Sequence, residues 1–187
     1  MGKKAGLGWD VDHEHDAAKF AANVLSFAYE GLESLPPGLV RILTTIRPFT
    51  LYPDTTENST LNAQWDIDWS VRLFAGTNPH VMVHEVGHGV ANIIGNYREN
   101  FYEEWIAFNR GAPYNTDFKS AYPKLPKNQQ GYFYSDYASF NHTEDIAETF
   151  VLLYYDDVGP PYSDTLIAKG NIWKVLSRNY SIWIRTR

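Results

Sequence analysis

Hydrophobic residues recur at three- and four-residue steps in several segments of the chain, a spacing that places them on one face of a helix. The first such segment covers residues 16–33, and Pro36-Pro37-Gly38 interrupts the chain after it. Further helices are predicted at residues 39–45, 79–94, 99–109, 141–155 and 164–179. The helix at 79–94 has clear end signals, because Asn78 suits the N-cap, Pro79 suits the first turn and Gly95-Asn96 predicts a stop.

A strict alternation of apolar and polar residues predicts a single strand over residues 64–74. The apolar set is Trp65, Ile67, Trp69, Val71 and Leu73. A period of two puts this set on one face of a sheet and the polar set on the other. Residues 47–52 read as another strand. The pattern therefore predicts an α+β fold, mainly helical, with a small antiparallel or mixed sheet that has one wet face.

Length, composition and charge limit the number of domains and exclude several kinds of site and partner. A length of 187 residues favours one domain spanning 1–187, and we expect residues 1–15 to be a loosely ordered start. The absence of cysteine excludes disulfides, thiolate metal sites and a cysteine nucleophile. A net charge of -6 argues against nucleic-acid binding. Because apolar runs are far shorter than the roughly 20 residues of a membrane helix, we expect no membrane span, and no signal peptide is recognisable.

The residues His84-Glu85-Val86-Gly87-His88 fit the pattern H-E-x-x-H within the predicted helix 79–94. On a helix, positions four apart lie on one face, so both imidazoles can bind one metal while the Glu85 carboxylate stays available beside them. A chain of this composition would contain the pattern by chance about 0.01 times. Imidazole and carboxylate ligands with an open fourth position are typical of catalytic zinc.

The third ligand is sought among carboxylates on a second element. Glu144 and Glu148 lie one turn apart on the predicted helix 141–155. We interpret Glu144 as the ligand and Glu148 as the acceptor of the other N–H of a ligating imidazole. As an alternative, Asn141 followed three residues later by Glu144 resembles a capping box. The ligand interpretation is favoured because H-E-x-x-H leaves the metal one ligand short.

The combination of His84-Glu85-x-x-His88 with Tyr137, Glu144 and Ala147-Glu148 resembles the zinc metallopeptidases of the lethal-factor type and the related proline-proline endopeptidases. The resemblance covers about residues 78–150. It implies a glutamate-type zincin fold, one zinc ion held by His84, His88 and Glu144, and extracellular localisation. It also implies that Glu85 is the general base and that the Tyr137 hydroxyl faces the reacting carbonyl.

The expected reaction is therefore peptide-bond hydrolysis by a zinc-activated water. The resemblance further implies a protein or peptide substrate that lies extended along a sheet edge, and the alternating strand at residues 64–74 fits that role. Two alternatives remain open. The chain could be a zinc hydrolase of a non-peptide amide or ester, or a non-catalytic peptide-binding module on the same fold.

Several residues outside the motif allow narrower predictions. Gly87 weakens its helix by about 1 kcal/mol, so we expect it to permit close approach of the helix that carries Glu144. The long loop at residues 114–131 is a candidate specificity wall or lid. His80 is expected to be structural. His13-Glu14-His15-Asp16 could be read as a second metal site, but its place before a helix favours a solvated helix start.

Overall fold

The computed structural model of the 187-residue chain describes residues 11–40, 50–54, 62–66, 69–115, 124–156 and 162–183, without side chains at 11–15, 97 and 175–183. The elements are α1 (Val11–Ser34), β1 (Thr50–Pro53), β2 (Ala63–Trp65), β3 (Ser70–Leu73), α3 (Pro79–Tyr97), α4 (Phe101–Ala107), the short 3₁₀ helices η1 (Lys127–Gln129) and η2 (Tyr137–Ser139), α5 (His142–Tyr154) and α6 (Asp164–Trp183). The fold is mainly helical α+β with a small mixed sheet, as the sequence predicts.

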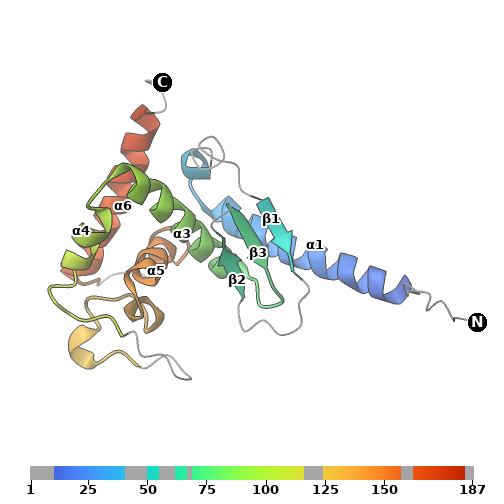
Figure 1. Cartoon of the computed structure of the whole chain (residues 1–187), viewed down its shortest axis with the longest axis horizontal. Coiled ribbons are helices and arrows are strands. Elements are labelled where there is room, and N and C mark those ends of the chain that lie inside the picture. Colours follow the sequence, from blue (N-terminus) through green and yellow to red (C-terminus); the bar gives the residue numbers. More distant parts are fainter. Residues whose placement is uncertain are drawn as a thin grey trace, which may run out of the picture.

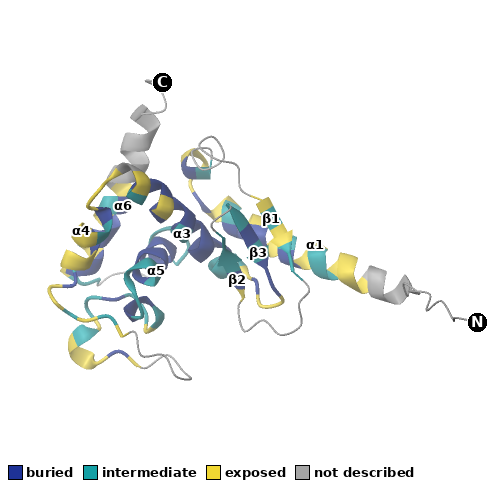
Figure 2. Ribbon diagram, in the orientation of Figure 1, coloured by how far each residue is buried: buried dark blue, intermediate teal, exposed yellow. Residues whose placement is uncertain are grey.

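Helix α3 lies at the centre of the molecule. The sheet and α1 lie on one side of it, and α4, α5 and α6 lie on the other (Figure 1). Residues of α3 contact α1, β2, α4 and α5. Buried residues are concentrated along α3 and α5 (Figure 2), where they form half of the main hydrophobic core. The motif-bearing helix is therefore held from both sides.

The start of α3 follows the sequence signals, but its end does not. The Asn78 side chain accepts a hydrogen bond from the backbone N–H of Val81 at 2.9 Å, as an N-cap should. The predicted stop at Gly95-Asn96 is wrong, because the helix continues to Tyr97. Gly95 instead makes room for a neighbour: a Cβ there would lie 2.6 Å from the ring of Tyr102.

The sheet corrects a second prediction. The alternating segment 64–74 is not one strand but two, β2 and β3, which pair antiparallel, while β1 pairs parallel with β3 in the order β1-β3-β2. The chain reverses where Trp69 adopts a left-handed φ of 68°, and the N–H of Trp69 donates to the carbonyl of Asp66. Because the apolar–polar alternation is kept on both sides of the reversal, period alone could not reveal it.

The remaining helices agree with the sequence in type and differ in extent. Helix α1 begins before residue 16, α4 is shorter than predicted, and α6 is longer. Residues 37–40 are helical, and the rest of the helix predicted at 39–45 lies outside the described residues, as do residues 47–49 of the first predicted strand. Helix α5 begins as expected, since Asn141 accepts hydrogen bonds from the N–H groups of Thr143 and Glu144.

The predicted close approach at Gly87 is confirmed. A Cβ at this position would lie 3.0 Å from the Cα of Ala147 and 3.1 Å from the Cβ of Phe150, both on α5. Contacts this short with backbone and with the root of a side chain are tighter than most Cβ contacts, so a side chain at this position would require α5 to shift. Gly87 therefore sets the distance between α3 and α5.

A buried ion pair ties α5 to α6. Lys169 and Asp145 are both fully buried, and the Lys169 ammonium donates to both Asp145 oxygens at 2.7 and 2.8 Å and to the carbonyl of Tyr132 at 2.6 Å. Asp145 also accepts from the indole of Trp105 and the hydroxyl of Tyr114, each at 2.9 Å. A buried charge network is tolerated only when its members are paired in this way.

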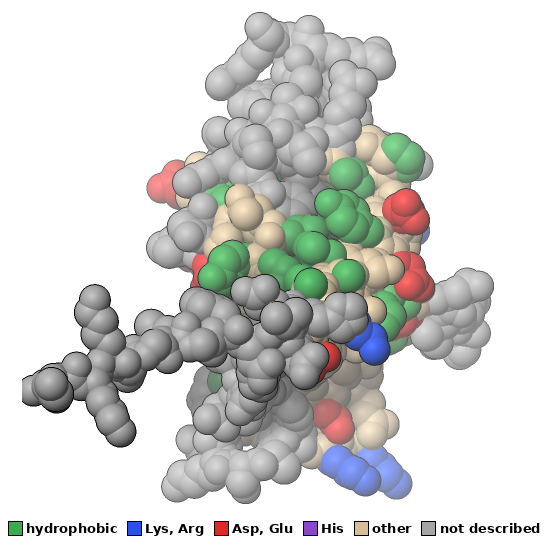
Figure 3. All heavy atoms as spheres, turned by 90° about the vertical axis from the view of Figure 1, so that its right-hand side faces the viewer, with side chains coloured by type: hydrophobic (Ala, Val, Ile, Leu, Met, Phe, Trp, Pro, Cys, Tyr) green, Lys and Arg blue, Asp and Glu red, His purple; other side chains and the backbone are tan. Residues whose placement is uncertain are grey.

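The surface of the described part is not uniformly polar. Phe27 and Tyr29 of α1 and Tyr52 of β1 are exposed, and the face seen along α1 carries a group of hydrophobic side chains (Figure 3). Within the described residues, none of the helices combines the length and the apolar character that crossing a bilayer would need.

Replacing Gly87 with leucine should lower the free energy of unfolding by about 1–3 kcal/mol, because the added side chain must force α5 away from α3. Urea unfolding followed by circular dichroism measures the change. Gly38→Leu is the matched control: Gly38 is exposed, and a Cβ there meets nothing within 4 Å. Equal stability of the two variants would contradict the close approach.

Candidate metal centre

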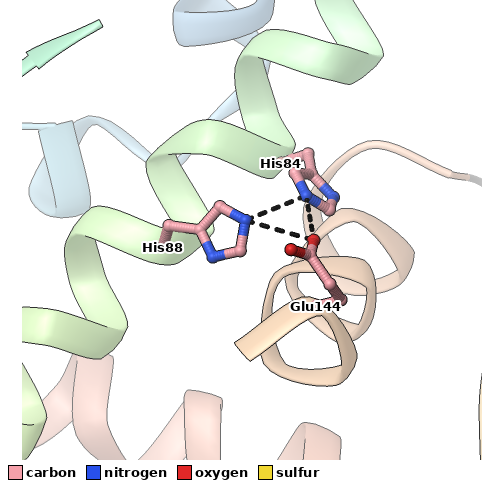
Figure 4. A group of neighbouring side chains, drawn as sticks. All are labelled: His84, His88 and Glu144. Carbon is pink, nitrogen blue, oxygen red and sulfur yellow. Dashed lines mark hydrogen bonds and ion pairs between the residues drawn. The ribbon is translucent and has the colours of Figure 1, made fainter. Parts of the chain in front are cut away.

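Three side chains from two helices converge at one point. His84 and His88 extend from α3 toward Glu144 on α5 (Figure 4). The His84 Nε2 atom lies 3.1 Å from His88 Nε2 and 3.0 Å from Glu144 Oε2, and His88 Nε2 lies 3.3 Å from the same oxygen. The three atoms therefore form a nearly equilateral triangle.

This triangle has the size that a tetrahedral zinc site requires. Zinc binds histidine nitrogen and carboxylate oxygen at about 2.0–2.1 Å, so two ligand atoms in a tetrahedron lie about 3.3 Å apart. The observed separations of 3.0, 3.1 and 3.3 Å are close to that value. Among the described residues, this group of two His side chains and one Glu side chain could hold a metal ion, and its donor set fits zinc.

Glu148 orients one of the imidazoles. Its Oε1 atom lies 2.8 Å from Nδ1 of His84, and both side chains are buried. When Nδ1 carries the proton and donates it to this carboxylate, Nε2 keeps its lone pair for a metal. Glu148 thus contacts one nitrogen of the His84 ring and Glu144 the other.

Ser135 was not identified from the sequence, although it connects two parts of the site. Its hydroxyl donates to Oε2 of Glu148 at 2.6 Å and accepts from the backbone N–H of Ala138 at 3.0 Å. Ala138 belongs to η2, the turn that also carries Tyr137. The only sequence signal was a serine two residues before Tyr137, and serine is common in loops for many other reasons.

The electrostatics of the three side chains favour a cation at their centre. Burial lowers the pKa of His84, but the carboxylates of Glu144 and Glu148 more than offset this effect and raise it to about 10. Burial alone would raise the pKa of Glu144, yet His84 and His88 hold this pKa well below its usual range. The carboxylates are thus kept ionised, which suits a divalent metal ion.

Glu85 on α3 and Tyr137 on η2 line the same cavity. The backbone N–H of Trp65 in β2 donates to Oε2 of Glu85 at 2.6 Å, which fixes one oxygen of this buried carboxylate. The ring of Tyr137 stacks on His84, with centroids 5.5 Å apart and planes 22° apart. Both residues and His88 line a cavity of about 380 Å³.

The capping alternative for Glu144 is resolved by the same geometry. Asn141 does cap α5, accepting from the N–H of Glu144 at 2.9 Å. The Glu144 carboxylate, however, faces the two imidazoles. The cap is therefore made by the side chain of Asn141 alone, and the side chain of Glu144 remains available for the metal.

Other candidate residues lie apart from this group. His80 lies on α3 one turn before His84, with its Nε2 3.6 Å from a carboxylate oxygen of Asp156. The side chains of residues 13–15 lie outside the described residues, as do positions 116–123 of the loop at 114–131. The rest of that loop is irregular apart from η1, and it includes Tyr114, which bonds to the buried carboxylate of Asp145.

No protein-family model, curated protein or solved structure matches this chain. The possible metal site rests on the geometry of His84, His88 and Glu144, and the resemblance to lethal-factor-type peptidases stays a prediction from the motif.

Replacing Glu148 with alanine should weaken zinc binding by about 10–100-fold, because the His84 ring loses the carboxylate that orients it. Competition with a chromophoric chelator measures the affinity. Glu103→Ala is the control, since Glu103 is an exposed glutamate on α4. If the two variants bind zinc equally well, Glu148 has no role in holding the imidazole.

Proposed function

We propose that this protein is a zinc-dependent endopeptidase. The proposal is carried by one observation: His88, a member of the possible His84/His88/Glu144 metal site, lines a cavity together with the Glu85 carboxylate and Tyr137. Those are the groups that metal-assisted amide hydrolysis needs, namely ligands, a base and an oxyanion donor. The resemblance of the motif to lethal-factor-type peptidases points in the same direction.

A zinc ion held by these ligands would lower the pKa of a water molecule and polarise a carbonyl. Glu85 is proposed to accept the proton of the attacking water and to deliver it to the leaving amine. The hydrogen bond from Trp65 supports this role, because it fixes one carboxylate oxygen and leaves the carboxylate its second oxygen for proton transfer.

Tyr137 is proposed to stabilise the negative charge that develops on the carbonyl oxygen. Its ring is held against His84, and η2, which carries it, is linked through Ser135 to Glu148. A hydroxyl positioned before the reaction stabilises the transition state without having to reorganise. This role requires Tyr137 to keep the position that its stacking on His84 gives it.

The substrate is proposed to bind as an extended strand along β2. This strand is at the edge of the sheet, it contacts α3, and its residues Ala63, Gln64 and Trp65 line the cavity. An edge strand can add a peptide through main-chain hydrogen bonds. Peptide-bond hydrolysis is favoured over hydrolysis of a small ester or amide because β2, which lies beside the site, can bind a peptide chain.

Glu85→Gln should keep zinc affinity within about twofold and reduce peptide turnover by about 1,000-fold, because the amide cannot accept the proton. Cleavage of a random peptide library, with and without chelator, measures turnover, and chelator competition measures zinc. A variant that lost zinc, or one that cleaved peptides at the wild-type rate, would contradict the role of Glu85.

Tyr137→Phe should lower kcat by about 100-fold with little change in zinc affinity, since one oxyanion donor is removed and no ligand is lost. Tyr132→Phe is the control, because Tyr132 lies five residues away and outside the residues that line the cavity. The comparison needs kcat from steady-state kinetics on one peptide. A Tyr137→Phe enzyme as fast as Tyr132→Phe would remove the hydroxyl from the mechanism.

A further inference from the structure

The cavity extends beyond His88 along α3. Ala91 and Asn92, three and four residues after His88, lie on the same side of the helix and line the cavity. Tyr102 of α4 and Thr143 of α5 complete this wall. We refer to Asn92, Tyr102 and Thr143 as the distal wall: Asn92 lies one helical turn after His88, Tyr102 lies on α4, and Thr143 directly precedes Glu144 on α5.

Tyr102 of α4 is held in place by contacts with two other elements, α3 and α5. Its ring packs over Gly95, where any Cβ would collide with it, and it meets the ring of His142 edge to face at 5.3 Å. Its hydroxyl donates to the carbonyl of Ala91 at 3.4 Å. Gly95, which does not end α3 as predicted, thus leaves room for the Tyr102 ring to pack in a fixed position beside the cavity.

The distal wall offers hydrogen-bond acceptors. The Thr143 hydroxyl donates to the side chain of Asn141 at 2.5 Å, and the Tyr102 hydroxyl donates to the chain of α3. Each hydroxyl proton is therefore directed into the protein, and the oxygen keeps lone pairs that can accept. Asn92 is exposed at the rim, and its amide can both donate and accept.

Among the described residues that line the cavity, the acidic and basic side chains are Glu85 and His88, and the distal wall contains none. A charged substrate side chain that contacts only this wall would lose water without gaining a counter-ion, whereas a carboxamide could donate its N–H groups to the wall.

We infer that the distal wall is a specificity pocket for an uncharged, hydrogen-bond-donating substrate side chain, such as that of glutamine or asparagine, close to the cleaved bond. The inference rests on the proposed endopeptidase function and adds the substrate class to it. Glutamine and glutamate have nearly the same shape, so their comparison isolates the charge. The pocket should favour glutamine at least 10-fold in kcat/KM.

The test uses the zinc-loaded full chain. A random peptide library first locates the position of strongest side-chain preference next to the cleaved bond, and peptides with Gln, Glu, Lys and Leu at that position follow. Asn92→Lys should raise kcat/KM for the Glu peptide relative to the Gln peptide by about 10-fold. Asn92→Asp should raise kcat/KM for the Lys peptide relative to the Gln peptide by a similar factor. The zinc-loaded Glu85→Gln variant allows binding to be measured without cleavage. On this variant the four peptides should rank by affinity in the same order as they rank by kcat/KM on the wild type.

Asn96 supplies the matched control, since it is an exposed asparagine one turn further along α3 that does not line the cavity. Asn96→Lys and Asn96→Asp should leave the preference within about twofold of wild type. If the wild-type chain cleaves no peptide, the proposed function and this inference both fail. If it cleaves but accepts Gln and Glu equally, or if Asn92 and Asn96 variants behave alike, the inference alone is overturned.

Discussion

Helices α3 and α5 approach each other so closely at Gly87 that a single added carbon would press on the backbone of Ala147. This distance decides whether a carboxylate from α5 can reach two imidazoles on α3, because glutamate is short and the ligand atoms must lie about 3.3 Å apart. A residue with a larger side chain between the two histidines would separate the helices and with them the ligands. The possible metal site therefore depends on the absence of a side chain at residue 87.

Contacts from outside the motif orient the groups within it. Glu148 holds the ring of His84, Ser135 holds Glu148, and the backbone of β2 holds Glu85. Each of these bonds fixes the orientation of a side chain at or next to the possible metal site. Groups that are held in this way need little reorganisation when a charge develops beside them.

Much of this arrangement was readable from local signals. The N-cap Asn78, the apolar periodicity of residues 141–155, the spacing of His84 and His88 and the glycine between them predicted both helices and their contact. The hairpin was missed because alternation continues through the reversal at Trp69, and the end of α3 was missed because Gly95 serves packing against Tyr102. Ser135 and Lys169 depend on partners distant in sequence, so no local pattern could identify them.

The buried pair of Asp145 and Lys169 has a consequence for the neighbouring residue. Successive residues of a helix project about 100° apart, so Glu144 and Asp145 fasten α5 in two directions, one to α3 and one to α6. A helix pinned at two angles cannot turn about its own axis. The rotational setting of the Glu144 carboxylate is thus coupled to α6, none of whose described residues lines the cavity.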